Sequence, residues 1–90
     1  MPFCSMKQEL FIIIIDEMED YLPVTEHNIN CRIFVNKEDA MNEFNRLKSV
    51  AMNDIRFDTF HEWKDGFTAH RINHYYGWHF DVRIQSCSVE

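Results

Sequence analysis

The chain has 90 residues and a mass of 10.9 kDa, which suits one domain built around one hydrophobic core. Hydrophobic residues make up 46% of it and aromatic residues 14%, so the chain is too apolar to be a disordered polyelectrolyte. Nine Lys and Arg against fifteen Asp and Glu give a net charge of −6, which argues against direct nucleic-acid binding.

Cysteine usage and the N-terminal residues indicate a cytoplasmic protein. The three cysteines, Cys4, Cys31 and Cys87, form no CxxC pair, which argues against a disulfide framework. The opening residues lack the basic region and cleavage site of a signal peptide, and residues 1–8 are expected to be frayed. The longest apolar run is six residues, far below the roughly twenty that cross a bilayer as a helix. We expect no contact with a membrane.

The first third of the chain predicts two strands separated by an acidic loop. Leu10–Ile15 is short and apolar at every position, which predicts a central strand covered on both faces, or one whose second face meets a partner. Residues 16–30 are acidic and contain Pro23, so we expect a loop there. Cys31–Val35 predicts a second strand.

A helix is predicted over Lys37–Met52. Asn36 is a suitable N-cap, and Glu38 and Asp39 in the first turn complement the helix dipole. The apolar positions have a spacing of three and four residues and form one stripe suited to packing on a sheet. They are Ala40, Met41, Phe44, Leu47 and Ala51.

The final third predicts three strands, because apolar positions recur at every second residue. The residues expected on the apolar face are Ile55, Phe57, Thr59, His61 and Trp63, then Phe67, Ala69, Arg71, Asn73 and Tyr75, then Trp78, Phe80, Val82 and Ile84. The two glycines, Gly66 and Gly77, fall at the junctions, where a positive φ favours glycine.

The turn lengths decide which side chains share a face. At the first turn, a two-residue loop pairs Lys64 with Phe67, whereas a three-residue loop pairs Trp63 with Phe67. We favour the three-residue loop, because it keeps the large apolar groups together. At the second turn, a two-residue loop pairs Tyr75 with Trp78.

These registers place a group of metal-ligating residue types on the opposite face of the sheet. His74 stands across from His79, with Asp81 one step along and Asp58 or His70 near enough to complete a shell. Such residues also form ordinary solvated sheet faces, and we favour that interpretation. No cofactor is expected.

Two glycines cannot build a dinucleotide-binding or phosphate-binding loop, and no serine lies in a nucleophile elbow. We therefore expect a protein that is not an enzyme.

The charge is concentrated near the N-terminus. Residues 1–30 contain one Lys and six Asp or Glu, a balance of −5 out of −6. Such a run is either a solvated loop or an anionic patch that steers a basic partner. The expected protein-binding residues are Asp16, Glu17, Met18, Glu19, Asp20 and Tyr21, with Phe60 and Ile72 as a second contact on the opposite sheet face.

The expected fold is α+β, a mainly antiparallel sheet of about five strands in the order β-β-α-β-β-β, with one helix on one face. A homodimer whose sheets join is the alternative, since the helix is too short to cover the apolar first strand. In size, charge and element order, the chain resembles small acidic accessory proteins of phages and other mobile elements. Some of these, anti-CRISPR proteins among them, inhibit host enzymes by occupying basic clefts. The resemblance implies a protein-binding inhibitor or adaptor; the alternative is a metal-binding protein or hydrolase using His74, His79 and Asp81.

Overall fold

The structure, a computed structural model, describes residues 8–21, 24–72 and 76–89. One helix and five strands form in the order β-β-α-β-β-β, which confirms the expected α+β fold. They are β1 (Gln8–Tyr21), β2 (Val24–Phe34), α1 (Lys37–Met52), β3 (Thr59–Trp63), β4 (Gly66–Ile72) and β5 (Tyr76–Val89).

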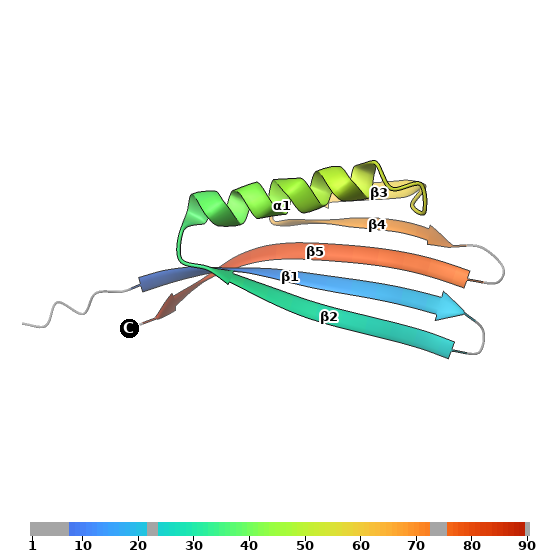
Figure 1. Ribbon diagram of the computed structural model, residues 1–90, viewed down its shortest axis with the longest axis horizontal. Coiled ribbons are helices and arrows are strands. Elements are labelled where there is room, and N and C mark those ends of the chain that lie inside the picture. The colour runs from blue at the N-terminus through green and yellow to red at the C-terminus, as the bar shows by residue number, and fades with distance from the viewer. Residues whose placement is uncertain (1–7, 22–23, 73–75, 90) are drawn as a thin grey trace, which may run out of the picture.

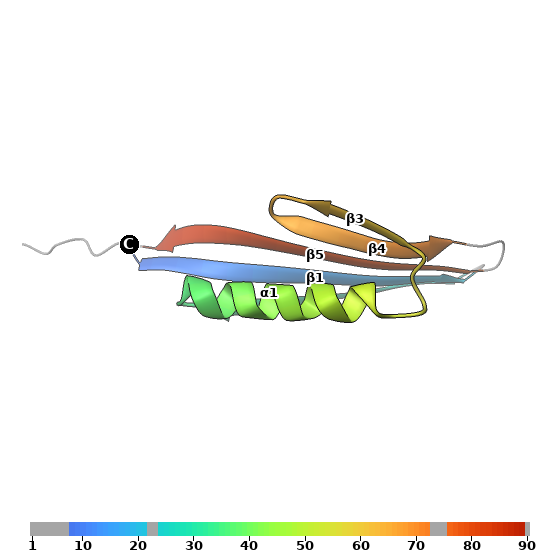
Figure 2. The same ribbon diagram turned by 90° about the horizontal axis from the view of Figure 1, so that it is seen from above.

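A single antiparallel sheet has the strand order β2-β1-β5-β4-β3, and α1 lies across one of its faces (Figures 1 and 2). β1 and β5 are the long central strands, each of 14 residues. They pair along their whole length, from Gln8 opposite Val89 to Tyr21 opposite Tyr76. No helix within the described part of the chain has the length and apolar character to cross a membrane.

The acidic loop predicted over residues 16–30 is wrong. Residues 16–21 continue β1, and residues 24–30 form the first part of β2. Acidic residues disfavour strands only weakly, and β1 is held by backbone hydrogen bonds to a strand on each side. Those two ladders outweigh the local preference of the side chains.

The helix forms where the sequence predicts it. Asn36 Oδ1 accepts a hydrogen bond from the Glu38 amide at 2.8 Å, which caps the first turn. Salt bridges link the helix to both edges of the sheet, from Glu43 to Arg32 on β2 and from Lys48 to Glu62 on β3. These contacts fix the helix across the sheet.

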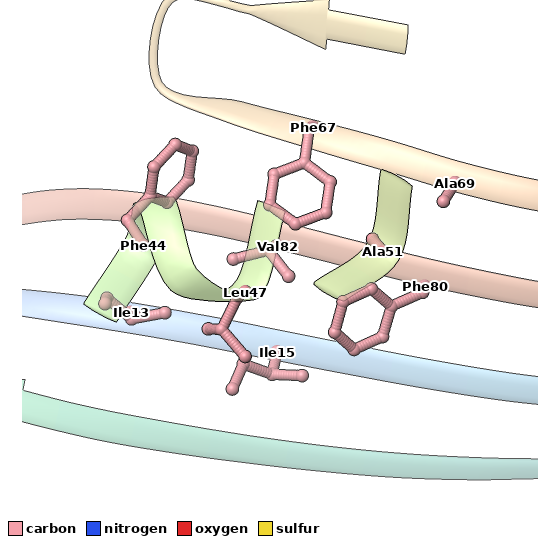
Figure 3. Packing of buried hydrophobic residues seen from close by; sticks show 9 residues of the cluster. All are labelled: Ile13, Ile15, Phe44, Leu47, Ala51, Phe67, Ala69, Phe80 and Val82. Carbon is pink, nitrogen blue, oxygen red and sulfur yellow. The ribbon is translucent and has the colours of Figure 1, made fainter. Parts of the chain in front are cut away.

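The core lies between α1 and the three middle strands (Figure 3). Phe67 on β4 is at its centre, fully buried, with ring centroids 5.6 Å from Phe44, 5.4 Å from Phe60 and 5.9 Å from Phe80. The cluster of buried residues is Ile13, Ile15, Phe44, Leu47, Ala51, Phe67, Ala69, Phe80 and Val82. The predicted helix stripe and the predicted apolar residues of β4 and β5 supply most of it.

The turn between β3 and β4 differs from both alternatives considered. Trp63 pairs with Gly66, so the loop is Lys64-Asp65, and Phe67 faces Glu62. This register puts Phe60 on the helix face, packed against the core, and puts His61 and Trp63 on the opposite face. The expected helix contact of Trp63 is therefore wrong, and so is the placement of Phe60 on the uncovered face.

Close approach, rather than a positive φ, explains glycine at position 66. A Cβ there would lie 2.7 Å from the carbonyl oxygen of Val82 and 2.8 Å from the ring of Trp63. Gly77 is also inside a strand, opposite Asp20 on β1 and Ile72 on β4. Neither glycine is the turn residue that the sequence predicted.

The register between β4 and β5 is shifted from the expected one. Ile72 pairs with Gly77 and His70 pairs with His79, whereas the sequence predicted that Tyr75 pairs with Trp78. The shift is an even number of residues, so it leaves Phe67, Phe80 and Val82 on the expected face. Ile55, predicted on that face, is 89% exposed in the connection between α1 and β3.

Candidate functional site

The two long strands extend past the end of the helix. Sixteen helical residues span about 24 Å, whereas the 14 residues of β1 span about 46 Å. α1 starts near the end of β2 and runs back over the sheet, leaving the far ends of β1, β2 and β5 beyond it (Figure 1). The helix face of the sheet is therefore open at that end.

A pocket of about 470 Å³ occupies this uncovered end. β1 contributes Glu17 and Glu19, and β5 contributes the aromatic rings of Phe80 and Trp78, which pair with them across the strands. The remaining lining residues are Met18 on β1, His27 and Asn28 on β2, Arg56 and Phe57 from the α1–β3 connection, and His79 on β5. Each glutamate thus stands beside an aromatic ring.

The connection after α1 supplies a layered wall. The ring of Phe57 stacks on Phe80 with centroids 6.1 Å apart and an angle of 24° between the planes. The guanidinium carbon of Arg56 lies 5.4 Å from the centroid of Phe57, within the range of a cation–π contact. A cation, an aromatic ring and a second aromatic ring therefore follow one another at the rim.

The side chain of Arg56 is bonded to a neighbour in sequence. Its side chain donates to the Asp54 carboxylate, with an Nη2–Oδ2 distance of 2.8 Å. This hydrogen bond is the main cause that raises the pKa of Arg56 and lowers the pKa of Asp54. Glu17 and Glu19 raise the pKa of Arg56 further through their charge, so their field reaches a guanidinium at the rim.

The pocket offers two carboxylates and a set of aromatic faces, which together suit a cation. A lysine or arginine side chain from another protein combines a positive head with an apolar stem. Carboxylates pair with the head, and aromatic faces attract a cation lying above them.

Strand alternation divides the predicted acidic patch between two faces. Glu17 and Glu19 lie on the helix face and line the pocket, whereas Asp16 lies on the opposite face, 3.3 Å from His27 Nδ1. Met18 alternates with them along the strand. The side chains of Asp20 and Tyr21 lie outside the described residues. The described side chains of the predicted acidic patch therefore lie on two faces of the sheet and do not form one continuous patch.

The second predicted contact is also divided. Phe60 packs against the core on the helix face. Ile72 pairs with Gly77 through its backbone, and its side chain lies outside the described residues.

The predicted metal ligands are only partly placed. His79 pairs with His70, and their rings are stacked with centroids 5.7 Å apart. Asp81 stands between Asp16 and Thr68, and His74 lies outside the described residues. Within the residues that the structure describes, no group of three His, Cys, Asp or Glu side chains is suitably arranged to hold a metal ion.

Trp78, Phe80 and Phe57 were expected in the core, and their part in a pocket was not predicted. The lengths of the helix and the strands could have indicated the pocket. The apolar stripe of the helix ends at Ala51, so the helix is too short to cover strands of 14 residues. Comparison with protein-family models, curated proteins and solved structures gives no match to the chain.

Proposed function

We propose that the protein is a small, non-catalytic binding module that engages a basic protein surface, acting as an inhibitor or adaptor of its partner. The observation that carries the proposal is the pairing of Glu17 and Glu19 with Phe80 and Trp78 in an open pocket. A lysine or arginine of the partner enters that pocket. The net charge of the chain, −6, favours the encounter with a basic surface.

Arg56 supports this proposal because it shows how a guanidinium lies at the rim. Its guanidinium lies over the ring of Phe57 and is bonded to Asp54. The charges of Glu17 and Glu19 raise its pKa. Because the ring of Phe57 is already contacted by Arg56 and Phe80, an incoming guanidinium meets the carboxylates of Glu17 and Glu19 and the ring of Trp78.

A titration with a defined cation tests the proposal. A blocked Gly-Arg-Gly-Arg-Gly peptide is added to ¹⁵N-labelled protein, and the indole N–H signal of Trp78 is followed by NMR. The citrulline version of the peptide keeps the shape and removes the charge. We expect the arginine peptide to shift the Trp78 signal, with an affinity that falls as salt is raised.

Two variants with the same change in charge distinguish binding in the pocket from general electrostatic attraction to the chain. Glu17→Gln with Glu19→Gln should weaken peptide binding about 2- to 30-fold, since each exposed ion pair contributes about 0.2–1 kcal/mol. Glu9→Gln with Asp65→Asn removes the same charge at the other end of the sheet and should leave the affinity nearly unchanged. If both pairs weaken binding equally, or the Trp78 signal does not respond, the pocket is not the binding site.

A further inference from the structure

The face of the sheet opposite α1, here called the open face, is left uncovered by the fold and carries isoleucines over β1 and β2. It is formed by the even-numbered residues of β1 and β4 and the odd-numbered residues of β2, β3 and β5. No helix or strand packs on it within the described residues. We propose that two copies of this chain assemble through their open faces, and that this contact is independent of the pocket on the helix face.

Isoleucines gather on one side of this face, over β1 and the edge strand β2. Ile12 on β1 lies beside Ile33 on β2, and Ile14 lies one step along. Ile29 and Ile33 are 61% and 65% exposed. Strands that are apolar on both faces are normally covered on both faces, and contiguous exposed apolar patches mark protein contacts.

The charge on the open face identifies a second copy as the occupant. Among its described side chains, the formal charges are those of Asp16, Asp81 and Arg83, a balance of −1. The whole chain has a charge of −6, so most of the excess lies off this face. A basic partner is attracted to the helix side, whereas two open faces meet with little repulsion.

The size of the open face matches what a stable dimer needs. The five strands hold 51 residues, and at about 4.8 Å by 3.3 Å for each residue they give a face of roughly 800 Å². Specific interfaces bury about 800 Å² on each partner. Two stacked sheets separated by about 10 Å would interdigitate their isoleucines as the layers of a β-sandwich do.

Sedimentation equilibrium tests the assembly on the whole chain, with a reductant present because Cys31 and Cys87 are exposed thiols. We expect a mass of about 22 kDa, twice the 10.9 kDa of one chain, at micromolar concentrations and above. Ile29→Lys with Ile33→Lys should give a monomer with an unchanged circular dichroism spectrum, because both side chains are already exposed. The matched control, Val50→Lys with Met52→Lys, changes exposed apolar residues of α1 and should stay dimeric.

One further variant separates face-to-face assembly from pairing of the free β2 edges. Gln85 is on β5, two strands from that edge, and pairs with Ile12 on β1. Gln85→Lys should therefore weaken a face-to-face dimer at least tenfold and leave an edge-to-edge dimer intact. A monomeric wild-type chain, or a dimer that survives Ile29→Lys with Ile33→Lys or Gln85→Lys, would overturn the proposal. None of these outcomes changes the peptide titration at the pocket, so the two proposals succeed or fail separately.

Discussion

Replacing Phe67 with alanine tests whether one ring organises the core. Phe67 is fully buried and contacts the rings of Phe44, Phe60 and Phe80. Truncating a buried phenylalanine to alanine costs about 3–5 kcal/mol, because transfer free energy is lost and a cavity remains. A 90-residue domain has a free energy of unfolding of about 5–14 kcal/mol at about 0.05–0.15 kcal/mol per residue. The substitution should therefore remove between about a fifth and all of the stability.

Urea unfolding followed by circular dichroism measures this loss. The midpoint should fall while the slope with denaturant is kept, since the surface exposed on unfolding hardly changes. All variants are compared at one protein concentration, because the proposed dimer would add to the apparent stability. Phe67→Leu should remain folded and lose less, which keeps the comparison measurable if the alanine variant does not fold.

Phe57→Ala is the matched control for the alanine variant. Phe57 packs against the core from the rim of the pocket and is only partly buried. It should cost clearly less than Phe67→Ala. A loss below about 1.5 kcal/mol at Phe67, or equal losses at the two positions, would show that the described core is misplaced.

Three further changes test local features. Asn36→Ala should lower the free energy of unfolding by about 1 kcal/mol in urea, because it removes the cap of α1. Gly66→Ala should cost about 1–3 kcal/mol and lower the thermal midpoint, because its Cβ meets the backbone oxygen of Val82 at 2.7 Å. Asp54→Asn should cost about 0.2–1 kcal/mol at neutral pH as an exposed ion pair is lost. Since Arg56 lowers the pKa of Asp54, this contribution is present above the ordinary value of 3.8 and disappears as pH falls through the lower folded value. Unfolding curves of wild type and Asp54→Asn should therefore converge in acid.

The helix was predictable because its signals are local and agree with one another. Asn36, the acidic first turn and the stripe from Ala40 to Ala51 all indicate the same segment, and the structure gives Lys37–Met52. The core of the sheet was predictable for a similar reason: residues at every second position of β4 and β5 are apolar, and an even shift in register does not change their face.

The acidic half of β1 was not predictable from its own residues. Asp16 and Glu17 favour a loop locally, and only the two neighbouring ladders make the segment a strand. The β3–β4 register was missed because we assumed that every large apolar side chain shares a face. Trp63 instead lies over Gly66 on the open face and is 45% exposed. The pocket was missed together with the acidic half of β1, because it lies where β1, β2 and β5 extend past the end of the helix.

Successive residues of β1 point to opposite faces of the sheet and therefore contact different surroundings. Ile13 and Ile15 fill the core and Glu17 lines the pocket, whereas Ile12 and Ile14, which alternate with Ile13 and Ile15, belong to the open face. A scan of single substitutions along this strand should therefore show a period of two. Substitutions at one set of positions would alter folding or partner recognition, and those at the other would alter self-association. Natural selection can adjust either surface of this short segment without disturbing the other.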